Sequence, residues 1–393
     1  MTDQYVDNGV PFLRSQDIQP FKVSISDLKF ISQEFHRKIR KSALGPGDVA
    51  IVRTGYPGTA AVIPPELREA NCADLVIVRP GPKLDPYFVA ALFNSTFGKN
   101  FVSGALVGVA QQHFNVGVAK SMEVPLPPLD TQRRIAGILS AYDDLIENNE
   151  RRIAILEEMA RRVFREWFVD FRFPGHEAVR MVDTEAGRIP EGWEPRLLAE
   201  VIDLDPTTKV AKDGEKPFVP MGALSTLYSY IEGVEQRSGN SGSKFKNGDT
   251  LLARITPCLE NGKTALVSFL PSNNDAAFGS TEFIVMRGRR VPSSFVYCLA
   301  RSEGFRAHAI KDMSGATGRQ RVRNEALAQF QLMVPPLDLL TQFDGLAAAA
   351  LQQVVLLARA SGQLRKARDL LLPRLISGEL PVSTAEPLLE AAE

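Results

Sequence analysis

Cysteine and histidine are scarce in this sequence, and neither forms a cluster. The three cysteines, Cys72, Cys258 and Cys298, lie far apart, so neither a disulfide framework nor a zinc site is predicted. The four histidines lack the spacing of a metal site or a catalytic triad, and no Gly-x-x-x-x-Gly-Lys-Ser/Thr loop is present to bind phosphates. We therefore expect no catalytic residue, no metal site and no cofactor site in this chain.

An excess of charge of one sign and long apolar runs are also lacking. Lys+Arg and Asp+Glu both number 46, so no global positive field drives nonspecific binding to nucleic acid. The first ten residues are polar and do not have the pattern of a secretion signal. No uninterrupted apolar run reaches the roughly 18 residues expected of a membrane span. We therefore expect a cytoplasmic protein whose contacts to nucleic acid come from local patches or from a partner.

The length and composition indicate more than one globular domain. Single hydrophobic cores rarely grow beyond about 250 to 300 residues, and this chain has 393. Hydrophobic residues make up 44% and charged residues 23%, which is typical of a soluble globular protein.

An internal repeat of about 200 residues divides the chain. The motif Pro-Pro-Leu-Asp at residues 127–130 recurs 208 positions later at residues 335–338. Shorter matches keep the same order at offsets of 201 to 207, and they pair residues 11–12 with 217–218, 47–48 with 248–249, 59–62 with 264–267, and 88–89 with 295–296. Five matches in one order indicate a duplication. The first copy has fewer residues ahead of its first match, so we expect the first domain to be shortened at its N-terminus.

Both halves show the same order of predicted elements. β-rich segments at residues 48–52 and 250–254 follow Gly-Asp turns, and each half ends in a Pro-Pro pair and a long helical segment. We predict an α+β protein with a pseudo-two-fold internal repeat, in which two long antiparallel coiled-coil helices join two β-rich globular domains. The expected boundaries are 1–126 for the first domain, 127–174 for the first helix, 175–334 for the second domain, 335–378 for the second helix and 379–393 for a C-terminal tail.

Apolar residues recur every seven positions in both predicted helices, which is typical of a coiled coil. A second row in the first helix holds residues 139, 146, 153, 160 and 167. Asn149 occupies a place in the first row, where it is either a buried residue that fixes the register or an exposed residue at the edge. The residues that we expect to pair the helices are Ile135, Tyr142, Asn149, Leu156, Val163, Leu357, Leu364 and Leu371.

The predicted helices are long enough to act as a spacer. Two helices of about 40 residues would each reach about 60 Å, more than the roughly 34 to 36 Å of one DNA turn. A duplicated domain with a spacer is what reading two separated DNA sites requires. The alternative is that the helices only bury their apolar seams against each other.

Two Gly-rich polar loops precede the Pro-Pro pairs at similar distances. Residues 315–323 read GATGRQRVR, and residues 108–113 read GVAQQH. Arg, Lys, Asn and Gln read base edges, whereas Arg, Lys and hydroxyl groups hold phosphates. The candidate DNA contacts are Arg319, Gln320, Arg321, Arg323, Lys244, Lys246 and Arg254 in the second domain, and Gln111, Gln112, His113, Arg37, Lys38, Arg40, Lys41 and Arg53 in the first. The alternative for each charged residue is a solvated surface position.

Several motifs make the chain similar to the specificity subunits of type I restriction-modification systems. They are VPLPPLDTQ at residues 124–132, IAGIL at 135–139, DDLIENN at 143–149, WFVDFRFP at 167–174, IPEGW at 189–193 and LLLPRLISG at 370–378. The resemblance covers the chain apart from its shortened N-terminus. It implies two target-recognition domains, each reading one half of a split, asymmetric site in double-stranded DNA, and helices that set the gap between the halves.

The resemblance also implies that catalysis belongs to partner subunits. In this family the helices dock two methyltransferase (M) subunits, which methylate adenine with S-adenosylmethionine as the donor. The resulting trimer recruits restriction/translocase (R) subunits, which require ATP and Mg. This chain would be the non-catalytic DNA-recognition subunit, without a cofactor of its own. The alternative is a coiled-coil scaffold whose globular ends bind proteins, which the neutral net charge favours.

Overall fold

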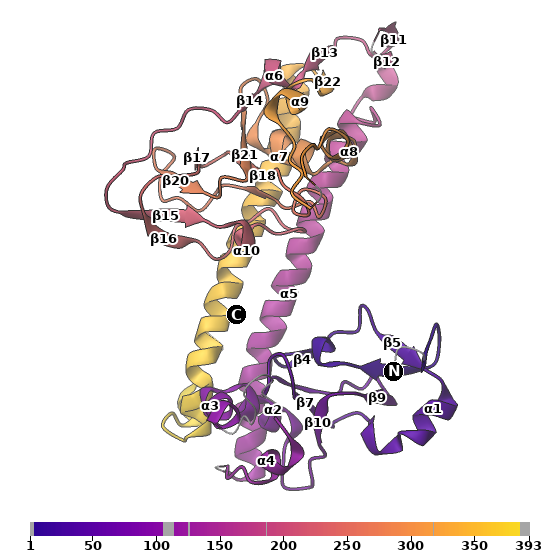
Figure 1. The fold of residues 1–393 in the computed structure, drawn as a ribbon, viewed down its shortest axis with the longest axis vertical. Helices are drawn as coiled ribbons and strands as arrows, with labels where there is room; N and C mark the ends of the chain where they lie inside the picture. Colours follow the sequence, from indigo (N-terminus) through magenta and orange to yellow (C-terminus); the bar gives the residue numbers. More distant parts are fainter. Residues whose placement is uncertain (1–3, 105–113, 125, 186, 317, 386–393) are drawn as a thin grey trace. The chain divides into compact units, whose positions relative to one another are not determined.

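The computed structural model describes residues 4–104, 114–124, 126–185, 187–316 and 318–385. The chain divides into two compact units, which we call unit 1 (residues 1–147 and 361–393) and unit 2 (residues 148–360). Each unit contains one globular domain and a part of each of two long helices. These helices are α5 (Leu129–Phe168) and α10 (Leu337–Ile376), drawn in magenta and yellow in Figure 1.

The described residues of unit 1 form two main sheets and, besides the long helices, four short α-helices. The larger sheet has the strand order β1-β5-β2-β9-β6 and the smaller one β10-β7-β8. The strands are β1 (Tyr5–Val6), β2 (Val10–Leu13), β3 (Ile18–Gln19), β4 (Lys22–Val23), β5 (Lys29–Ile31), β6 (Ala43–Leu44), β7 (Val49–Val52), β8 (Ala60–Val62), β9 (Ala70–Cys72) and β10 (Leu75–Val78). The helices are α1 (Gln33–Lys38), α2 (Pro86–Asn94), α3 (Thr96–Gly104) and α4 (Val116–Lys120). The strands β7 and β10 are rich in β-branched residues, which favour strands.

Unit 2 contains two four-stranded sheets, with the orders β14-β21-β18-β19 and β16-β15-β20-β17. The strands are β11 (Met181–Thr184), β12 (Gly187–Pro190), β13 (Glu194–Leu197), β14 (Ile202–Leu204), β15 (Glu215–Val219), β16 (Glu235–Ser238), β17 (Ser243–Lys246), β18 (Thr250–Ala253), β19 (Thr264–Leu266), β20 (Ala276–Gly279), β21 (Phe283–Gly288) and β22 (Gln331–Val334). The helices are α6 (Leu198–Val201), α7 (Ser293–Arg301), α8 (Glu303–Lys311) and α9 (Asn324–Ala328).

The two units repeat one fold. β2 runs parallel to β9 in unit 1, and β15 runs parallel to β20 in unit 2. The order β10-β7-β8 is repeated as β21-β18-β19, to which unit 2 adds β14. The helices α2 to α5 correspond in order to α7 to α10, at offsets of 207 or 208 residues. The duplication predicted from the sequence is therefore confirmed.

One of the sequence matches is wrong by one residue. Ile51 of β7 is opposite Ala60 of β8, and Leu252 of β18 is opposite Thr264 of β19. Ala60 therefore corresponds to Thr264, whereas the match of residues 59–62 with 264–267 paired it with Ala265. A shift of one residue exchanges the two faces of a strand. The pairing with the neighbouring strand, which a short sequence match does not contain, decides this correspondence.

An aspartate and an arginine form an ion pair at the same place in both units. Asp249 accepts two hydrogen bonds of 2.7 Å from Arg287 of β21. In unit 1 the Nε atom of Arg79 lies 3.8 Å from a carboxylate oxygen of Asp48. The two arginines are 208 residues apart, as expected for a duplicated pair. The Gly-Asp matches of the sequence therefore mark an aspartate that forms an ion pair at the end of a strand, as well as a turn.

In unit 1 the beginning of α5 packs against the end of α10. Ile135 and Tyr142 of α5 share a buried cluster with Leu372 and Ile376 of α10 and with Phe88 of α2. Asp85 supports this arrangement, because its side chain caps α2 by accepting a hydrogen bond from the N–H of Phe88 at 3.0 Å.

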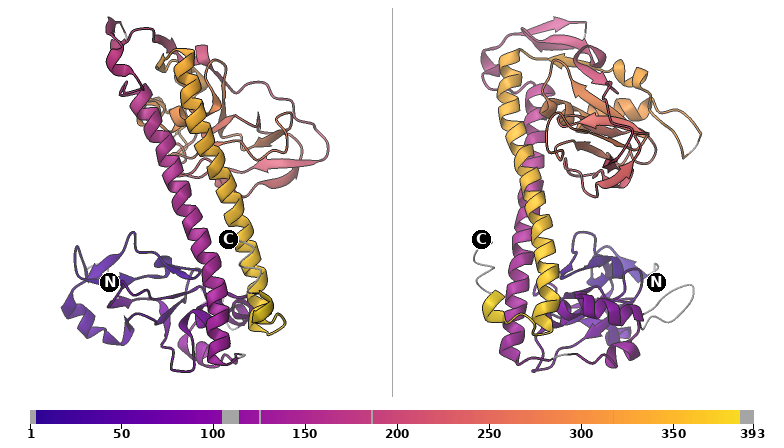
Figure 2. Two further views of the ribbon diagram at one scale, coloured as in Figure 1. Left: turned by 180° about the vertical axis from the view of Figure 1, so that it is seen from behind. Right: turned by 90° about the vertical axis from the view of Figure 1, so that its left-hand side faces the viewer.

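In unit 2 the end of α5 packs against the beginning of α10. The rings of Phe164 and Phe168 of α5 contact Phe343 of α10 and Phe295 of α7, with ring centroids 4.9 to 6.0 Å apart. Figure 2 shows the two helices side by side in each unit. Together, the contacts within the two units establish the predicted antiparallel pairing of the helices.

The buried face of α5 shifts along the helix. All residues of the second predicted row are buried, namely Leu139, Ile146, Ile153, Ala160 and Trp167. The first row is buried as far as Asn149, but Leu156 and Val163 are only partly buried, and the next residues, Glu157 and Phe164, are buried instead. A helix of 3.6 residues per turn drifts by about 20° per heptad relative to a repeat of 3.5, which accounts for this change.

The remaining residues predicted to pair the helices are Asn149 of α5 and three leucines of α10, and they are buried to different extents. Asn149 is 9% exposed, which favours a position in the seam over the exposed edge. In α10, Leu357 is buried beside Ile153, whereas Leu364 and Leu371 are partly buried against the cluster of unit 1.

A buried carboxylate joins α5 to the globular domain of unit 2. Glu157 is fully buried, and its two oxygens accept hydrogen bonds from the backbone N–H of Ser229 at 2.5 Å and from the hydroxyl of Tyr297 at 3.0 Å. Burial, followed by the charge of Glu157, raises the pKa of Tyr297 well above its usual value. The phenol therefore stays protonated and donates its hydrogen to the carboxylate.

The helix α10 is long and apolar enough to cross a membrane, judged by length and composition alone. Several of its apolar residues pack within the protein. Leu340, Phe343 and Leu351 lie in the main core of unit 2, and Leu372 and Ile376 lie in a buried cluster of unit 1. Packing against these cores accounts for part of its apolar composition, whereas Leu346, Leu356 and Leu370 of the same helix are exposed.

Candidate nucleic-acid interface

The predicted DNA-reading loop of unit 2 is a short hairpin between α8 and α9. Ser314 and Arg321 exchange two backbone hydrogen bonds, of 3.0 and 2.9 Å. Gly315 and Gly318 have φ angles of 127° and 81°, a region that favours glycine. Val322, which follows the hairpin, is fully buried. The loop is therefore anchored in the core on one side and presents its turn to solvent.

Arg254 lies at the base of this hairpin, directly after β18. Its Nη2 atom donates to the carbonyl of Val322 at 3.1 Å, and the N–H of Val322 donates to the carbonyl of Arg254 at 3.0 Å. The Nε atom of Arg254 is buried and has no hydrogen-bond partner within the described part of the chain. Arg254 therefore holds the base of the hairpin through the backbone of Val322.

Arg321 forms a bidentate ion pair with Glu282, which lies in the turn between β20 and β21. Its Nε and Nη2 atoms donate to the two carboxylate oxygens at 2.8 and 2.6 Å. The hydrogen bond from Arg321, reinforced by the charges of Arg321 and Arg254, lowers the pKa of Glu282 below its usual range. Glu282 is therefore ionised at neutral pH.

The other predicted contacts of unit 2 lie on the hairpin and on a neighbouring sheet. Arg319 and Arg323 are exposed and form no ion pair with any residue that the structure describes. Gln320 is half-buried, and its carbonyl accepts a hydrogen bond from the N–H of Thr256 at 3.0 Å. Lys244 and Lys246 lie on β17, an edge strand of the β16-β15-β20-β17 sheet.

Three predicted contacts of unit 1, Gln111, Gln112 and His113, lie outside the described residues. The base of their loop is described and repeats that of unit 2. Arg53 follows β7, and its Nε atom donates to the carbonyl of Phe114 at 3.2 Å. The N–H of Phe114 donates in return to the carbonyl of Arg53, also at 3.2 Å. Arg53 thus occupies the place that Arg254 has in unit 2.

An acidic residue completes the duplicated arrangement. The N–H of Arg254 donates to the carbonyl of Glu282 at 2.9 Å, and the N–H of Arg53 donates to the carbonyl of Asp74 at 3.2 Å. We define a loop base in each unit as three residues: the arginine, the acidic residue whose carbonyl it bonds, and the residue that follows the loop. They are Arg254, Glu282 and Val322 in unit 2, and Arg53, Asp74 and Phe114 in unit 1.

The remaining basic residues predicted for unit 1 lie elsewhere in its fold. Arg37 and Lys38 are in α1, and Arg40 and Lys41 are in the turn that follows it. All four are exposed, and Lys38 forms an ion pair of 2.7 Å with Glu34. None of them has a hydrogen bond to the described loop base of unit 1.

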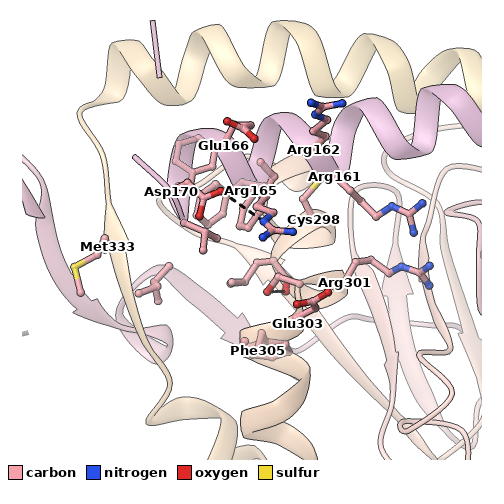
Figure 3. Close-up of a pocket in the computed structure, with 18 of the residues that line it drawn as sticks. Arg161, Arg162, Arg165, Glu166, Asp170, Cys298, Arg301, Glu303, Phe305 and Met333 are labelled. Carbon is pink, nitrogen blue, oxygen red and sulfur yellow. Dashed lines mark hydrogen bonds and ion pairs between the residues drawn. The ribbon is translucent and has the colours of Figure 1, made fainter. Parts of the chain in front are cut away.

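An arginine-rich pocket of about 930 Å³ lies in unit 2 between the end of α5 and the helices α7 and α8 (Figure 3). Most of its guanidinium groups already have partners. Arg301 donates to the carbonyls of three residues and Arg306 to one, at 2.7 to 3.1 Å. The ion pair of Arg165 with Asp170, 3.5 Å long, is drawn in Figure 3. We therefore interpret the pocket as a structural junction in which arginines hold loops and helices together.

Two of the three cysteines, Cys72 and Cys298, are buried and poorly suited to nucleophilic chemistry. Burial raises the pKa of Cys72 to about 12 and raises that of Cys298 further. Both side chains are therefore thiols at neutral pH, and the thiolate is the reactive form. No group of three or more His, Cys, Asp or Glu residues suited to a metal ion occurs among the described residues.

Comparison with known proteins gives a consistent result. Residues 58–158 match the family model of the type I restriction modification DNA specificity domain. The type I restriction enzyme MjaIX specificity subunit of Methanocaldococcus jannaschii is 27% identical over 276 residues, covering 67% of this chain and 62% of that subunit. The type I restriction enzyme EcoAI specificity subunit of Escherichia coli is 30% identical over 157 residues, covering 38% of this chain and 26% of that subunit. The chain spans less than two thirds of the length of either relative.

A solved structure supports the fold. The crystal structure of the type I restriction-modification system S subunit from M. genitalium superimposes with a TM-score of 0.56 at 12% identity, covering 96% of this chain and 91% of that one.

Proposed function

Because this chain belongs to the type I restriction-modification DNA specificity family, we propose that it is the DNA-recognition subunit of a type I restriction-modification complex. The loop of each unit reads one half of a split, asymmetric site in double-stranded DNA. The observation that carries the proposal is the duplicated loop base, in which Arg53 and Arg254 each bond the carbonyl of the residue after the loop, through Nε and Nη2 respectively, and each accept a backbone hydrogen bond from that residue. Two copies of one loop support are what a bipartite site requires.

In this proposal the catalytic steps belong to partner subunits. The helices α5 and α10 set the gap between the two half-sites and dock two methyltransferase subunits, which methylate adenine with S-adenosylmethionine. Restriction/translocase subunits join this assembly and use ATP and Mg. The chain itself binds DNA and its partners, holds no cofactor and works in the cytoplasm. The names of the related specificity subunits support the assignment of the chain to a type I restriction enzyme.

The hairpin of unit 2 gives the first test of the proposal. We expect Arg319→Ala combined with Arg321→Ala to weaken binding of the assembled complex to its DNA site by at least about tenfold, because base contacts and phosphate contacts are both removed. Binding is measured by gel shift with the methyltransferase subunits present, and copurification checks their association.

A matched control removes the same charge elsewhere in unit 2. Arg180 and Arg188 are both exposed, and Arg188 lies in β12. Their double replacement by alanine should leave the affinity unchanged. Equal affinity of the hairpin variant and the unchanged complex would argue against the loop as a reading element. A complex that binds no DNA at all, while the chain still binds partner proteins, would favour the scaffold alternative.

A further inference from the structure

The ion pair of Arg321 with Glu282 leaves part of the guanidinium group available. A guanidinium group has five N–H groups in a planar fork. Arg321 uses the Nε side of this fork for the carboxylate, through hydrogen bonds of 2.8 and 2.6 Å. The outer edge of the fork, formed by one N–H of Nη1 and one of Nη2, forms no hydrogen bond with the residues that the structure describes and can make a second bidentate contact. One arginine can therefore bind the carboxylate and a planar ligand at the same time.

The pair is exposed to solvent and is also well supported. The side chain of Arg321 is 45% exposed and that of Glu282 25% exposed. The backbone of Arg321 is fixed by its two hydrogen bonds to Ser314, and the carbonyl of Glu282 is fixed by the N–H of Arg254. Because the backbone and one edge of the guanidinium are both held, ordering Arg321 against a ligand costs little conformational entropy.

The charges of the pair favour a base over a phosphate as this ligand. An arginine adds nonspecific affinity for DNA by neutralising a phosphate. In this pair Glu282 compensates the charge of Arg321 and would repel a phosphate at the same place. A base edge carries no net charge and is recognised by the direction of its hydrogen bonds, which the pair preserves. Guanine offers two acceptors, O6 and N7, to a bidentate arginine.

We infer that Arg321 reads a guanine in the half-site of unit 2 and that Glu282 is the positioning residue that aims it. The inference rests on the proposed function of the chain as a DNA-recognition subunit. The duplication supports a role at the loop base, because unit 1 has Asp74 at the position that corresponds to Glu282, 208 residues earlier.

The test measures base preference in the complete complex of this chain with its methyltransferase subunits. Duplexes that carry the recognised site, with each base pair of the half-site replaced in turn, are compared for binding to each variant. We expect Arg321→Ala to abolish the preference for one G·C pair and Glu282→Ala to reduce the same preference about tenfold. Glu282→Gln, which keeps the shape but not the charge, should have an intermediate effect.

Binding to DNA that lacks the site distinguishes a role of Glu282 in positioning Arg321 from a general electrostatic effect on DNA affinity. Glu282→Ala removes a negative charge and frees Arg321 for a phosphate, so nonspecific affinity should rise and its salt dependence should steepen by about one released counterion. Glu194→Ala is the matched control, because it removes another exposed carboxylate, held 2.7 Å from Arg196. It should leave every base preference unchanged.

Three results would overturn the inference. If Glu282→Ala keeps the full preference at the base pair where Arg321→Ala loses it, Glu282 does not position the arginine. If Arg321→Ala weakens binding to all sequences equally, the arginine contacts a phosphate. If thermal unfolding shows that Glu282→Ala is not folded, Glu282→Gln decides, and an unchanged preference in that variant refutes the inference.

These results leave the proposed function intact, because the unchanged complex would still prefer one bipartite sequence. The absence of any sequence preference in the unchanged complex would instead refute the proposed function itself.

Discussion

Asp249→Ala is expected to lower the free energy of unfolding of unit 2 by about 3 to 5 kcal/mol, the usual cost of breaking a buried ion pair from one side. The carboxylate of Asp249 is 1% exposed and accepts two hydrogen bonds from Arg287, whose side chain is 21% exposed. Removing the carboxylate leaves the guanidinium of Arg287 without its main partner in a largely desolvated place. The pair joins β21 to the turn before β18, so its loss weakens the β14-β21-β18-β19 sheet.

Tryptophan fluorescence measures this effect selectively. The chain has two tryptophans, Trp167 and Trp193, and both are buried in the core of unit 2. The midpoint of denaturant unfolding followed by their fluorescence should therefore fall in Asp249→Ala. Asp48→Ala removes the corresponding aspartate of unit 1, where Arg79 is 3.8 Å away and 56% exposed. This looser pair should contribute about 1 kcal/mol or less, measured by circular dichroism. An unchanged fluorescence midpoint in Asp249→Ala would contradict a stabilising role for the buried pair.

Glu157→Ala is expected to destabilise unit 2 by about 3 kcal/mol, because it leaves the buried N–H of Ser229 and the buried hydroxyl of Tyr297 without their acceptor. Both donors lie in the globular domain, whereas Glu157 lies in α5. The substitution therefore weakens the attachment of the domain to the helix. Thermal unfolding followed by tryptophan fluorescence measures the loss.

The neighbouring residue provides a control on the same helix. Glu158 is 66% exposed and forms an ion pair of 3.2 Å with Arg161. Glu158→Ala should change the stability by about 0.5 kcal/mol or less, as is usual for exposed pairs. Similar melting temperatures for Glu157→Ala and Glu158→Ala would show that the buried carboxylate does not hold the domain to α5.

The sequence was most informative where structure follows from local pattern or from repetition. The predicted helical segments 127–174 and 335–378 contain α5 (Leu129–Phe168) and α10 (Leu337–Ile376). Heptad spacing identified them, because apolar residues on one face of a helix recur at a fixed local distance. The duplication was visible because both copies keep the Pro-Pro pair and the Gly-Asp turn. The prediction of buried residues was less accurate in the second half of α5, because the buried face of the helix changes after Asn149.

The sequence was least informative for partners that are distant along the chain. Arg321 and Glu282 are 39 residues apart, and Glu157 and Tyr297 are 140 residues apart, so no local spacing connects them. Of the candidate loop contacts, Arg53 and Arg254 were selected for their charge, but their hydrogen bonds to the loop ends are visible only in the fold. The repeat contained one unused signal. An offset of 208 residues relates Asp74 to Glu282 and Arg79 to Arg287. These matches identify one residue of each loop base and one residue of each aspartate–arginine ion pair.

Mapping of methylated adenines tests most directly whether each unit recognises its own half-site independently of the other. Residues 190–335 are replaced by the same segment of a specificity subunit that recognises another site, and the hybrid is produced together with the methyltransferase subunits. One half of the methylated bipartite sequence should then change, while the other half and the number of base pairs between them stay the same. A change in both halves, or in neither, would contradict the assignment of one half-site to each unit.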